Sequence, residues 1–313
     1  MSRVLVTGGA GFIGSHIAEA LLARGDEVVI VDDFSSGKQR NLQPDAKLVR
    51  GDLADPEVAA AAVAGCDAAV HCAARPSVAR SVEDPATSNL ANLQATTQLV
   101  LAARDAGLSR IVNSGTSAVY GDKLEGPAHE ELREAPVSPY GMNKLAAEHL
   151  LRMAPELYGV DSVCLRYFNV YGPRQDPGSP YSGVISIFIT KALSGLAPTI
   201  HGDGGHSRDF TYVGDIVRAN LAALDAPQGQ GRVVNVGGGS STSLNELWGA
   251  VREVCAQPQL EAQHGPDRPG DIRHSRARVE RAAELLGFST EVPLEAGLEL
   301  TVAWYRSRPQ AGA

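Results

Sequence analysis

Tyr140 and Lys144 lie four residues apart in the stretch from Pro139 to Lys144, and this spacing could support proton transfer. On an α-helix the two side chains would share one face, one turn apart. A free tyrosine has a pKa of about 10, which is too high for a base in neutral water. A nearby ammonium group favours the phenolate and lowers that pKa. The pair therefore predicts a proton-abstracting tyrosine, although two unrelated residues on a solvated helix face would give the same pattern.

A glycine-rich turn near the start of the sequence predicts a nucleotide-binding unit. The turn, from Thr7 to Gly14, follows the apolar run Val4 to Val6 and precedes a helical pattern. A second apolar run, Val28 to Val31, ends at Asp32 and Asp33. Glycines let the backbone approach a pyrophosphate, and the helix N-terminus supplies N–H donors. Asp32 stands where a carboxylate would accept from the ribose hydroxyls of NAD and repel the phosphate of NADP.

The alternation of strand and helix patterns continues along the chain. Strand-like runs occur at 47–50, 67–71, 110–114, 162–168 and 233–236, and a long helical pattern covers 84–106. Repeated βα units with short turns imply a parallel sheet with helices on both faces. We therefore predict an α/β fold, a Rossmann-type doubly wound parallel sheet with a smaller, mostly C-terminal α/β substrate domain. Ligands of such sheets lie beyond the carboxyl ends of the strands, where Asp52, Ala73 and Ser114 fall.

The order of motifs along nearly the whole chain resembles the extended short-chain dehydrogenase/reductase family, and within it the nucleotide-sugar epimerases. The spacing Gly8-x-x-Gly11-x-x-Gly14 fits this family. The other matching segments are Asp52-Leu53, Asn92 to Thr96, Ser114 to Gly121, Pro139 to Lys144, Leu165 to Pro173, Arg208-Asp209 and Arg268 to Asp271. The resemblance implies NAD as the cofactor and a UDP-sugar as the substrate.

The resemblance also implies roles for individual residues. The catalytic set would be Thr116, Tyr140 and Lys144, with Lys144 lowering the pKa of Tyr140, although Thr116 could instead be a turn-capping hydroxyl. The implied cofactor-binding residues are Gly8, Gly11, Phe12, Ile13, Gly14, Asp32, Asp33, Asp52, Leu53, Ala73, Asn92, Ser114, Tyr140, Lys144 and Tyr167. The implied substrate-binding residues are Asn169, Arg208, Arg268, Asp271 and Ser275. A separate physical argument supports the binding role of the two arginines, because a diphosphate needs guanidinium or backbone donors.

Two positions after Thr116 restrict the reaction. Related 4,6-dehydratases carry Asp-Glu there, since eliminating water from the sugar needs a base and an acid. This chain has Ser117 and Ala118, which supply neither. We therefore expect the oxidised 4-keto sugar to be reduced again at C4, on either face, which is epimerisation.

Two further positions bear on the choice of sugar. Ser275 corresponds to the family position that faces the C2 substituent, and a small residue there leaves room for an acetamido group. Ser275 could also simply begin or cap the next helix. Asp176 stands where uronate 4-epimerases tend to carry arginine, and an acid there would repel a uronate carboxylate.

The composition limits the class of protein. The formal net charge of −8 over 313 residues gives no basic stripe for a nucleic acid. No apolar run approaches twenty residues, so we expect no membrane association. The four scattered cysteines predict buried free thiols and a cytoplasmic location. The histidines at 201 and 206 have poor spacing for a metal site, and we expect a polar glycine loop there.

We therefore predict an NAD-dependent UDP-sugar 4-epimerase that acts on UDP-glucose and UDP-galactose and also accepts the N-acetylated pair. The alternatives are a UDP-glucuronate 4-epimerase, a nucleotide-sugar dehydrogenase or reductase, and a non-catalytic NAD-binding regulator. We assign residues 1–168 and about 209–238 to the NAD-binding domain, and about 169–208 and 239–313 to the nucleotide-sugar domain. A homodimer through the helices near 84–106 and 140–157 is expected, although the apolar pattern at Leu90, Leu93, Leu99 and Val100 also fits a core face.

Overall fold

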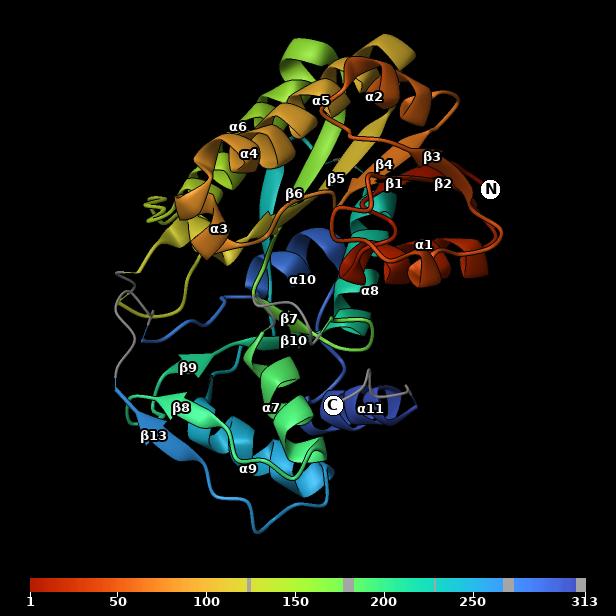
Figure 1. Cartoon of the computed structure of the whole chain (residues 1–313). Coiled ribbons are helices and arrows are strands. Elements are labelled where there is room, and N and C mark those ends of the chain that lie inside the picture. The colour runs from red at the N-terminus through yellow and green to blue at the C-terminus, as the bar shows by residue number, and fades with distance from the viewer. Residues whose placement is uncertain (123–124, 177–182, 228, 267–272, 308–313) are drawn as a thin grey trace.

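A seven-stranded parallel sheet lies at the centre of the computed structural model, which describes residues 1–122, 125–176, 183–227, 229–266 and 273–307 (Figure 1). The strand order is β11-β6-β5-β4-β1-β2-β3, and every neighbouring pair is parallel. The strands are β1 (Arg3–Thr7), β2 (Glu27–Asp32), β3 (Lys47–Arg50), β4 (Ala68–His71), β5 (Arg110–Thr116), β6 (Asp161–Tyr167) and β11 (Arg232–Val236). The predicted doubly wound α/β fold is confirmed.

Helices cover both faces of this sheet (Figure 1). One face carries α1 (Phe12–Arg24), α8 (Val213–Asp225) and α10 (Glu280–Leu286). The other carries α2 (Pro56–Val63), α5 (Ala95–Ala106) and α6 (Pro139–Tyr158). Shorter elements are η1 (Gln39–Asn41), α3 (Val78–Glu83), α4 (Pro85–Asn89), η2 (Leu90–Gln94) and η3 (Ser117–Tyr120).

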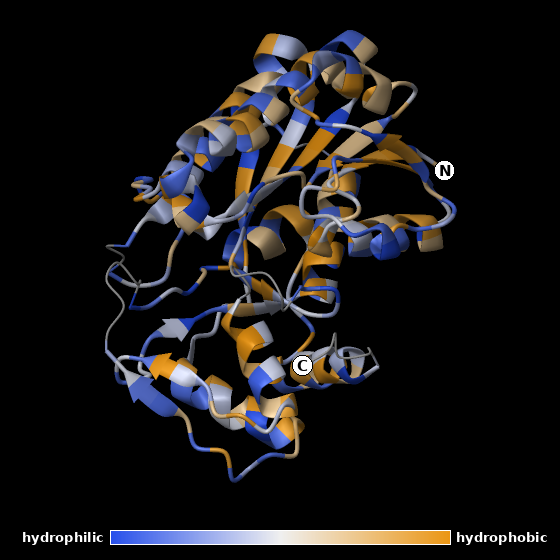
Figure 2. Cartoon of the chain, in the orientation of Figure 1, coloured by the Kyte–Doolittle hydropathy of each residue, from blue (hydrophilic) through white to orange (hydrophobic). Residues whose placement is uncertain are grey.

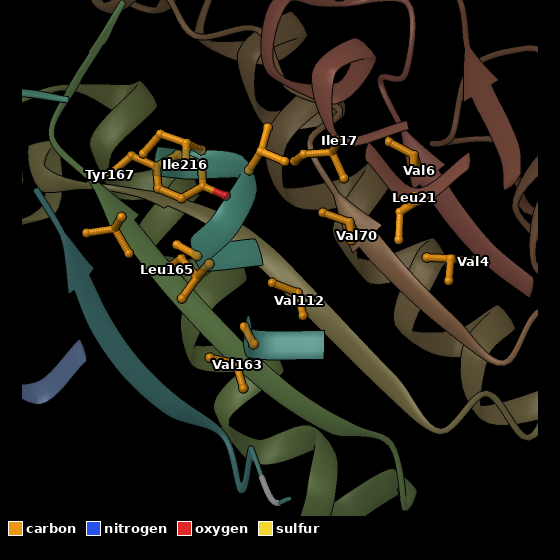
Figure 3. Packing of buried hydrophobic residues seen from close by; sticks show 14 of the residues in the cluster. Val4, Val6, Ile17, Leu21, Val70, Val112, Val163, Leu165, Tyr167 and Ile216 are labelled. Carbon is orange, nitrogen blue, oxygen red and sulfur yellow. The ribbon is translucent and has the colours of Figure 1, made fainter. Parts of the chain in front are cut away.

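Two hydrophobic cores lie against the two faces of the sheet. Successive strand residues point to opposite faces, so Val4 and Val6 enter one core and Leu5 enters the other. Figure 3 shows Val4, Val6, Val70 and Val112 of the first core beside Ile17 and Leu21 of α1. The central strands carry continuous apolar runs because both of their faces are covered.

A smaller unit follows the carboxyl ends of the strands and has its own core. Its helices are α7 (Val184–Leu193), α9 (Leu244–Val254) and α11 (Leu294–Arg306). Its strands form two-stranded pairs: β7 (Asn169–Tyr171) with β10 (Phe210–Tyr212), β9 (Ser207–Arg208) with β12 (Thr242–Ser243), and β8 (Thr199–His201) with β13 (Gln263–Gly265). Helix α10 lies late in the sequence yet contributes Ala282 to the first sheet core. The assignment of residues to an NAD-binding domain and a nucleotide-sugar domain remains a prediction.

Figure 2 shows hydrophobic residues concentrated along the strands of the large sheet, with polar residues on the outer faces of its helices. Within the described residues, no helix is long and apolar enough to cross a membrane. All four cysteines are free thiols; Cys66, Cys164 and Cys255 are buried, and Cys72 is half-buried.

Candidate active site

The glycine turn between β1 and α1 leaves no room for side chains. Gly8 has φ +67°, and a Cβ there would lie 2.9 Å from the Cα of Ala73. A Cβ on Gly14 would overlap the carbonyl oxygen of Gly8. Helix α1 begins after Gly11, which has no side chain to cap the first N–H groups. This cradle of backbone donors at a helix N-terminus suits a pyrophosphate.

Asp32 ends β2 beside this turn. Its carboxylate accepts hydrogen bonds from the backbone N–H groups of Ala10 at 2.9 Å and Phe34 at 2.8 Å. Burial raises the pKa of Asp32, and these two hydrogen bonds oppose the shift. Each carboxylate oxygen has two acceptor sites, so Asp32 can still accept from a ribose hydroxyl. Asp33 is exposed and accepts from the backbone and hydroxyl of Ser35.

Asp52 and Leu53 follow β3 at the same edge of the sheet. The exposed carboxylate of Asp52 accepts from the backbone N–H of Ala54 at 2.9 Å. Leu53 is buried and packs into the second sheet core. The first residue is therefore open to a ligand, whereas the second contributes mainly to the core.

A buried histidine, His71, connects β1, β4 and α5. The Thr7 hydroxyl accepts from the N–H groups of Cys72 at 3.1 Å and Ala73 at 3.0 Å, and lies 2.8 Å from Nδ1 of His71. With its acceptor sites in use, Thr7 donates its hydrogen to Nδ1, so Nε2 carries the proton. That Nε2 lies 2.9 Å from the hydroxyl of Thr96. Burial lowers the pKa of His71 to about 3, so the ring is neutral at physiological pH.

The same chain of hydrogen bonds continues to α6 through Asn92. The Thr96 hydroxyl donates to the carbonyl of Asn92, whose side chain accepts from the N–H of Arg75 at 2.9 Å. Asn92 also donates to the Ser88 hydroxyl, which in turn accepts from Asn143 at 3.1 Å. Asn92 lies in η2, a π-helical turn of the kind often found at functional sites. The segment after β4 is thus tied to α6.

The two hydroxyls expected to act on the sugar meet where β5 ends. Helix α6 begins at Pro139, and the Ser138 side chain accepts from the N–H of Gly141 at 3.1 Å. Tyr140 stands in the first turn, only 9% exposed, with the Thr116 side chain close enough to its hydroxyl to lower its pKa. Thr116 also accepts from the N–H of Ala118 at 3.2 Å. Its hydroxyl therefore caps a turn, as the alternative held, and contacts Tyr140 as well.

The pKa shifts differ from the simple expectation for a Tyr-Lys pair. Burial raises the pKa of Tyr140, and the Thr116 hydrogen bond opposes this shift. Lys144 is 3% exposed, and burial lowers its pKa to about 8. A pKa of about 8 still leaves Lys144 mostly charged at pH 7. The positively charged nicotinamide ring of oxidised NAD, placed beside the phenol, would lower the pKa of Tyr140.

A buried ion pair fixes the middle of α6 to β6. The guanidinium of Arg166 donates to Glu148 at 2.9 and 2.6 Å and to Glu134 at 2.8 Å. It also lies over the ring of Tyr120, 4.7 Å from the centroid. This anchor holds α6 one turn beyond Lys144. Nothing in the local sequence pattern pairs Arg166 with Glu148 or Glu134, so this anchor is not predictable from the sequence.

Ser114 and Tyr167, expected near the cofactor, lie side by side. The Ser114 hydroxyl donates to Cys72 Sγ at 3.1 Å and lies 3.2 Å from the Tyr167 hydroxyl. Asn220 of α8 also hydrogen-bonds with Tyr167. The ring of Tyr167 lies in the first core, near Ile216 (Figure 3). Both residues stand at the carboxyl edge of the sheet, as expected.

Among the expected substrate residues, Asn169, Arg208 and Ser275 are held together through Asp209. The carboxylate of Asp209 accepts from the N–H groups of Gly238 at 2.6 Å, Gly239 at 3.0 Å and Ala277 at 3.0 Å. The Asp209 carbonyl accepts from the N–H of Asn169. Asp209 belongs to a motif identified in the sequence, but this bridging was not foreseen. Arg268 and Asp271 lie outside the described residues.

The environments of Ser275 and Asp176 change how both bear on the sugar. Ser275 does not cap a helix: α10 begins at Glu280 after Val279. Instead, the backbone N–H of Ser275 donates to the carbonyl of Ser207, the residue before Arg208. Asp176 forms an ion pair with Lys38 at 3.2 Å. The expected repulsion between Asp176 and a uronate carboxylate is therefore weakened, because Lys38 compensates the charge of Asp176.

Among the described residues, no three His, Cys, Asp or Glu side chains lie close enough together to hold a metal ion. His201 is exposed and lies 3.2 Å from the carbonyl of Pro266, whereas His206 is buried beside Arg273.

Known proteins resemble this chain over nearly its whole length. Residues 4–237 match the NAD dependent epimerase/dehydratase family. A UDP-glucose 4-epimerase of Mycolicibacterium smegmatis is 39% identical, over 98% of this chain and 100% of that protein. The crystal structure of a UDP-glucose 4-epimerase from Thermotoga maritima with UDP-glucose has a TM-score of 0.94 and 38% identity, over 97% and 99% of the two chains. A UDP-N-acetylglucosamine 4-epimerase from Methanobrevibacter ruminantium, in complex with UDP-N-acetylmuramic acid, has a TM-score of 0.93 and 38% identity, over 98% of each chain.

Proposed function

The chain belongs to the NAD-dependent epimerase/dehydratase family, and we propose that it reversibly inverts C4 of a UDP-hexose through a transient 4-keto sugar. NAD is the cofactor of this family, and the glycine cradle with Asp32 fits it. When bound, NAD supplies the oxidation of the sugar at C4 and its later reduction. The observation that carries the proposal is that Thr116 ends β5 beside Tyr140 of α6, with the buried Lys144 one turn along the same helix.

In this proposal, residues of the chain remove and return one proton, that of the C4 hydroxyl. Tyr140 takes the proton of the C4 hydroxyl and returns it after the sugar has presented its other face. The Thr116 hydroxyl, beside Tyr140 at the end of β5, holds the C4 oxygen by a hydrogen bond. Lys144, buried and charged, stabilises the phenolate. The relatives that are UDP-glucose 4-epimerases support this assignment.

The residues after Thr116 favour epimerisation over dehydration. Ser117 and Ala118 open η3 and carry no carboxyl group that could remove the C5 proton or protonate a leaving hydroxyl. Reduction at C4 is then the route left to the keto sugar. The missing carboxyl groups at these two positions distinguish the chain from the dehydratases of the same family.

We propose that the enzyme accepts sugars with either a hydroxyl or an acetamido group at C2. Ser275 is small, adjoins the Arg208 strand, and does not serve as a helix cap. Arg208 would bind the diphosphate through its guanidinium. UDP-glucuronate remains the second candidate, because the Lys38–Asp176 pair compensates the charge that would repel a uronate.

A homodimer through α4, η2, α5 and α6 is part of the proposal. Leu99 and Val100 belong to the core, so they are not available to a partner. Leu90 is 53% exposed and Leu157 is 59% exposed, and these residues remain for an interface. The cytoplasmic location rests on the free cysteines, as in the sequence analysis. The two-domain division is likewise proposed.

The proposal is tested with a panel of UDP-sugars followed by chromatography and by absorbance at 340 nm. We expect interconversion of UDP-glucose with UDP-galactose, and of the two N-acetylated sugars, without net absorbance change. Steady accumulation of reduced cofactor would instead identify a dehydrogenase, and turnover of UDP-glucuronate alone would identify the uronate enzyme.

Ser275 gives a sharper test of substrate range. Ser275→Tyr should abolish turnover of UDP-N-acetylglucosamine first and leave UDP-glucose turnover largely intact, because the added ring fills the acetamido space. Ser275→Ala is the matched control and should keep both activities. Equal loss of both substrates in the tyrosine variant would contradict the assignment.

A further inference from the structure

Residues 173–176, here called the clasp, reach from the smaller unit to the glycine-turn unit. The carbonyl oxygen of Pro173 accepts from Nε2 of His16 at 2.9 Å. Arg174 donates to Glu19 at 2.6 Å and to the Ser15 hydroxyl at 3.3 Å. All three partners lie on the first two turns of α1, immediately after the glycine turn.

The end of the clasp contacts the opposite flank of the same turn. Asp176 forms its ion pair with Lys38 at 3.2 Å. The backbone N–H of Lys38 donates to the carbonyl of Ala10 at 2.9 Å, so this residue is joined directly to the glycine turn. The clasp therefore contacts both sides of the segment that would hold the pyrophosphate.

The clasp is also fixed to the smaller unit. The Gln175 side chain accepts from Ser186 of α7 at 2.9 Å, and the Gln175 carbonyl accepts from Tyr305 of α11 at 3.0 Å. Arg174 has φ +69°, a left-handed conformation that costs energy for a residue with a side chain. Partners on both sides of the backbone hold this conformation in place.

We propose that the clasp retains NAD by joining the two flanks of its binding turn to the smaller unit. For NAD to leave the turn, the contacts of Arg174 and Asp176 would have to separate from α1 and Lys38. Retention serves the reaction because loss of the reduced cofactor would leave the sugar in its keto form. The inference rests on NAD lying at the glycine turn and is independent of which UDP-sugar is turned over.

The test measures release of NAD from the purified, NAD-carrying protein without any sugar present. Released NAD is converted by an excess of a second dehydrogenase and followed at 340 nm. Arg174→Ala should speed release by about tenfold or more, because it removes a charge-assisted hydrogen bond. Asp176→Asn should speed release by roughly two- to fivefold, as expected for a more exposed pair.

The matched control is Asp225→Asn. Asp225 pairs with Arg24 at 2.9 Å, at the opposite end of the same helix α1, so its loss should leave the release rate unchanged. If Arg174→Ala does not fold, Glu19→Gln removes the same ion pair from the surface of α1 and should also accelerate release. Release at the wild-type rate from a folded Arg174 or Glu19 variant would overturn the proposal.

A charge exchange separates the cross-link from local effects. Lys38→Asp combined with Asp176→Lys restores an ion pair across the turn and should return release close to the wild-type rate. If the double variant released NAD as fast as Lys38→Asp or Asp176→Lys alone, the proposal that the clasp retains NAD would be contradicted. If the protein retained NAD but turned over no UDP-sugar, the proposed epimerase activity would be wrong, whereas the proposed role of the clasp would not be affected.

Discussion

The large sheet and the smaller unit position their functional side chains in different ways. At the sheet edge, His71, Asn92 and Lys144 are buried, and side-chain hydrogen bonds hold His71 and Asn92. In the smaller unit, Asn169 is exposed, Arg208 is half-exposed, and short two-stranded pairs support them. The Asp209 carbonyl accepts from the N–H of Asn169, and the Asp209 carboxylate accepts from the N–H groups of Gly238, Gly239 and Ala277.

The difference follows from what each region would bind under the proposed function. A cofactor that stays in one place suits a rigid, fully packed edge, where every strand end is fixed by its neighbours. A sugar that must present both faces of C4 suits side chains that can adjust. The exposed Asn169 and the half-exposed Arg208 keep that freedom.

The largest effect is expected from Tyr140→Phe. Loss of the phenol should lower kcat about 10²- to 10⁴-fold, because no other group takes the C4 proton. NAD content should not change, since the ring remains in place. Tyr120→Phe is the matched control: its hydroxyl donates to Asn235 at 2.6 Å, away from the Thr116–Tyr140 contact, so kcat should stay within about threefold. Retained turnover in the Tyr140 variant would remove it from catalysis.

Arg166→Met tests how far the rigidity of the sheet edge depends on the buried ion pair. The variant leaves Glu148 buried and unpaired, which should cost about 3–5 kcal/mol of unfolding free energy. Urea unfolding measures this loss. Glu261→Gln, which removes an exposed partner of Arg252, should cost at most about 0.5 kcal/mol. Similar losses of unfolding free energy in both variants would contradict the expected difference between buried and exposed ion pairs.

Lys144→Met should show a stability difference that depends on pH. Burial lowers the pKa of Lys144 from 10.5 to about 8, so keeping it charged in the fold opposes stability below pH 8. The methionine variant should be more stable at pH 7 by about 3 kcal/mol. Between pH 8 and 10.5 the folded wild type has released a proton that the unfolded chain still holds. Wild-type stability therefore rises with pH, and the difference should disappear; a difference that widens would contradict the shift.

The smallest effect is expected from Asp209→Asn, which tests the smaller unit. An amide must turn its NH₂ group toward at least one backbone N–H that the carboxylate now accepts from. We expect KM for the UDP-sugar to rise about tenfold, with NAD content unchanged. Asp203→Asn removes the exposed pair with Arg273 and should change KM less than about twofold. Loss of NAD from the Asp209 variant would show that the two regions are not independent.

Much of the fold could be predicted because its signals are local. The runs at β1 and β2 are apolar on both faces, and the helix between them carries a clear end signal, Gly25 after α1. The helix expected at 84–106 is present but includes the π-helical turn η2, which local periodicity does not distinguish from an α-helical turn.

The sequence by itself determined the parallel sheet, the glycine turn, and the placing of Tyr140 and Lys144 one turn apart, because periodicity and spacing along one element set these features. Only the tertiary structure decided the tautomer of His71, the Arg166–Glu148 anchor and the partner of Asp176. Arg174 and Glu19, for example, are 155 residues apart. Such partners depend on strand order and on how the units pack, which no local pattern records.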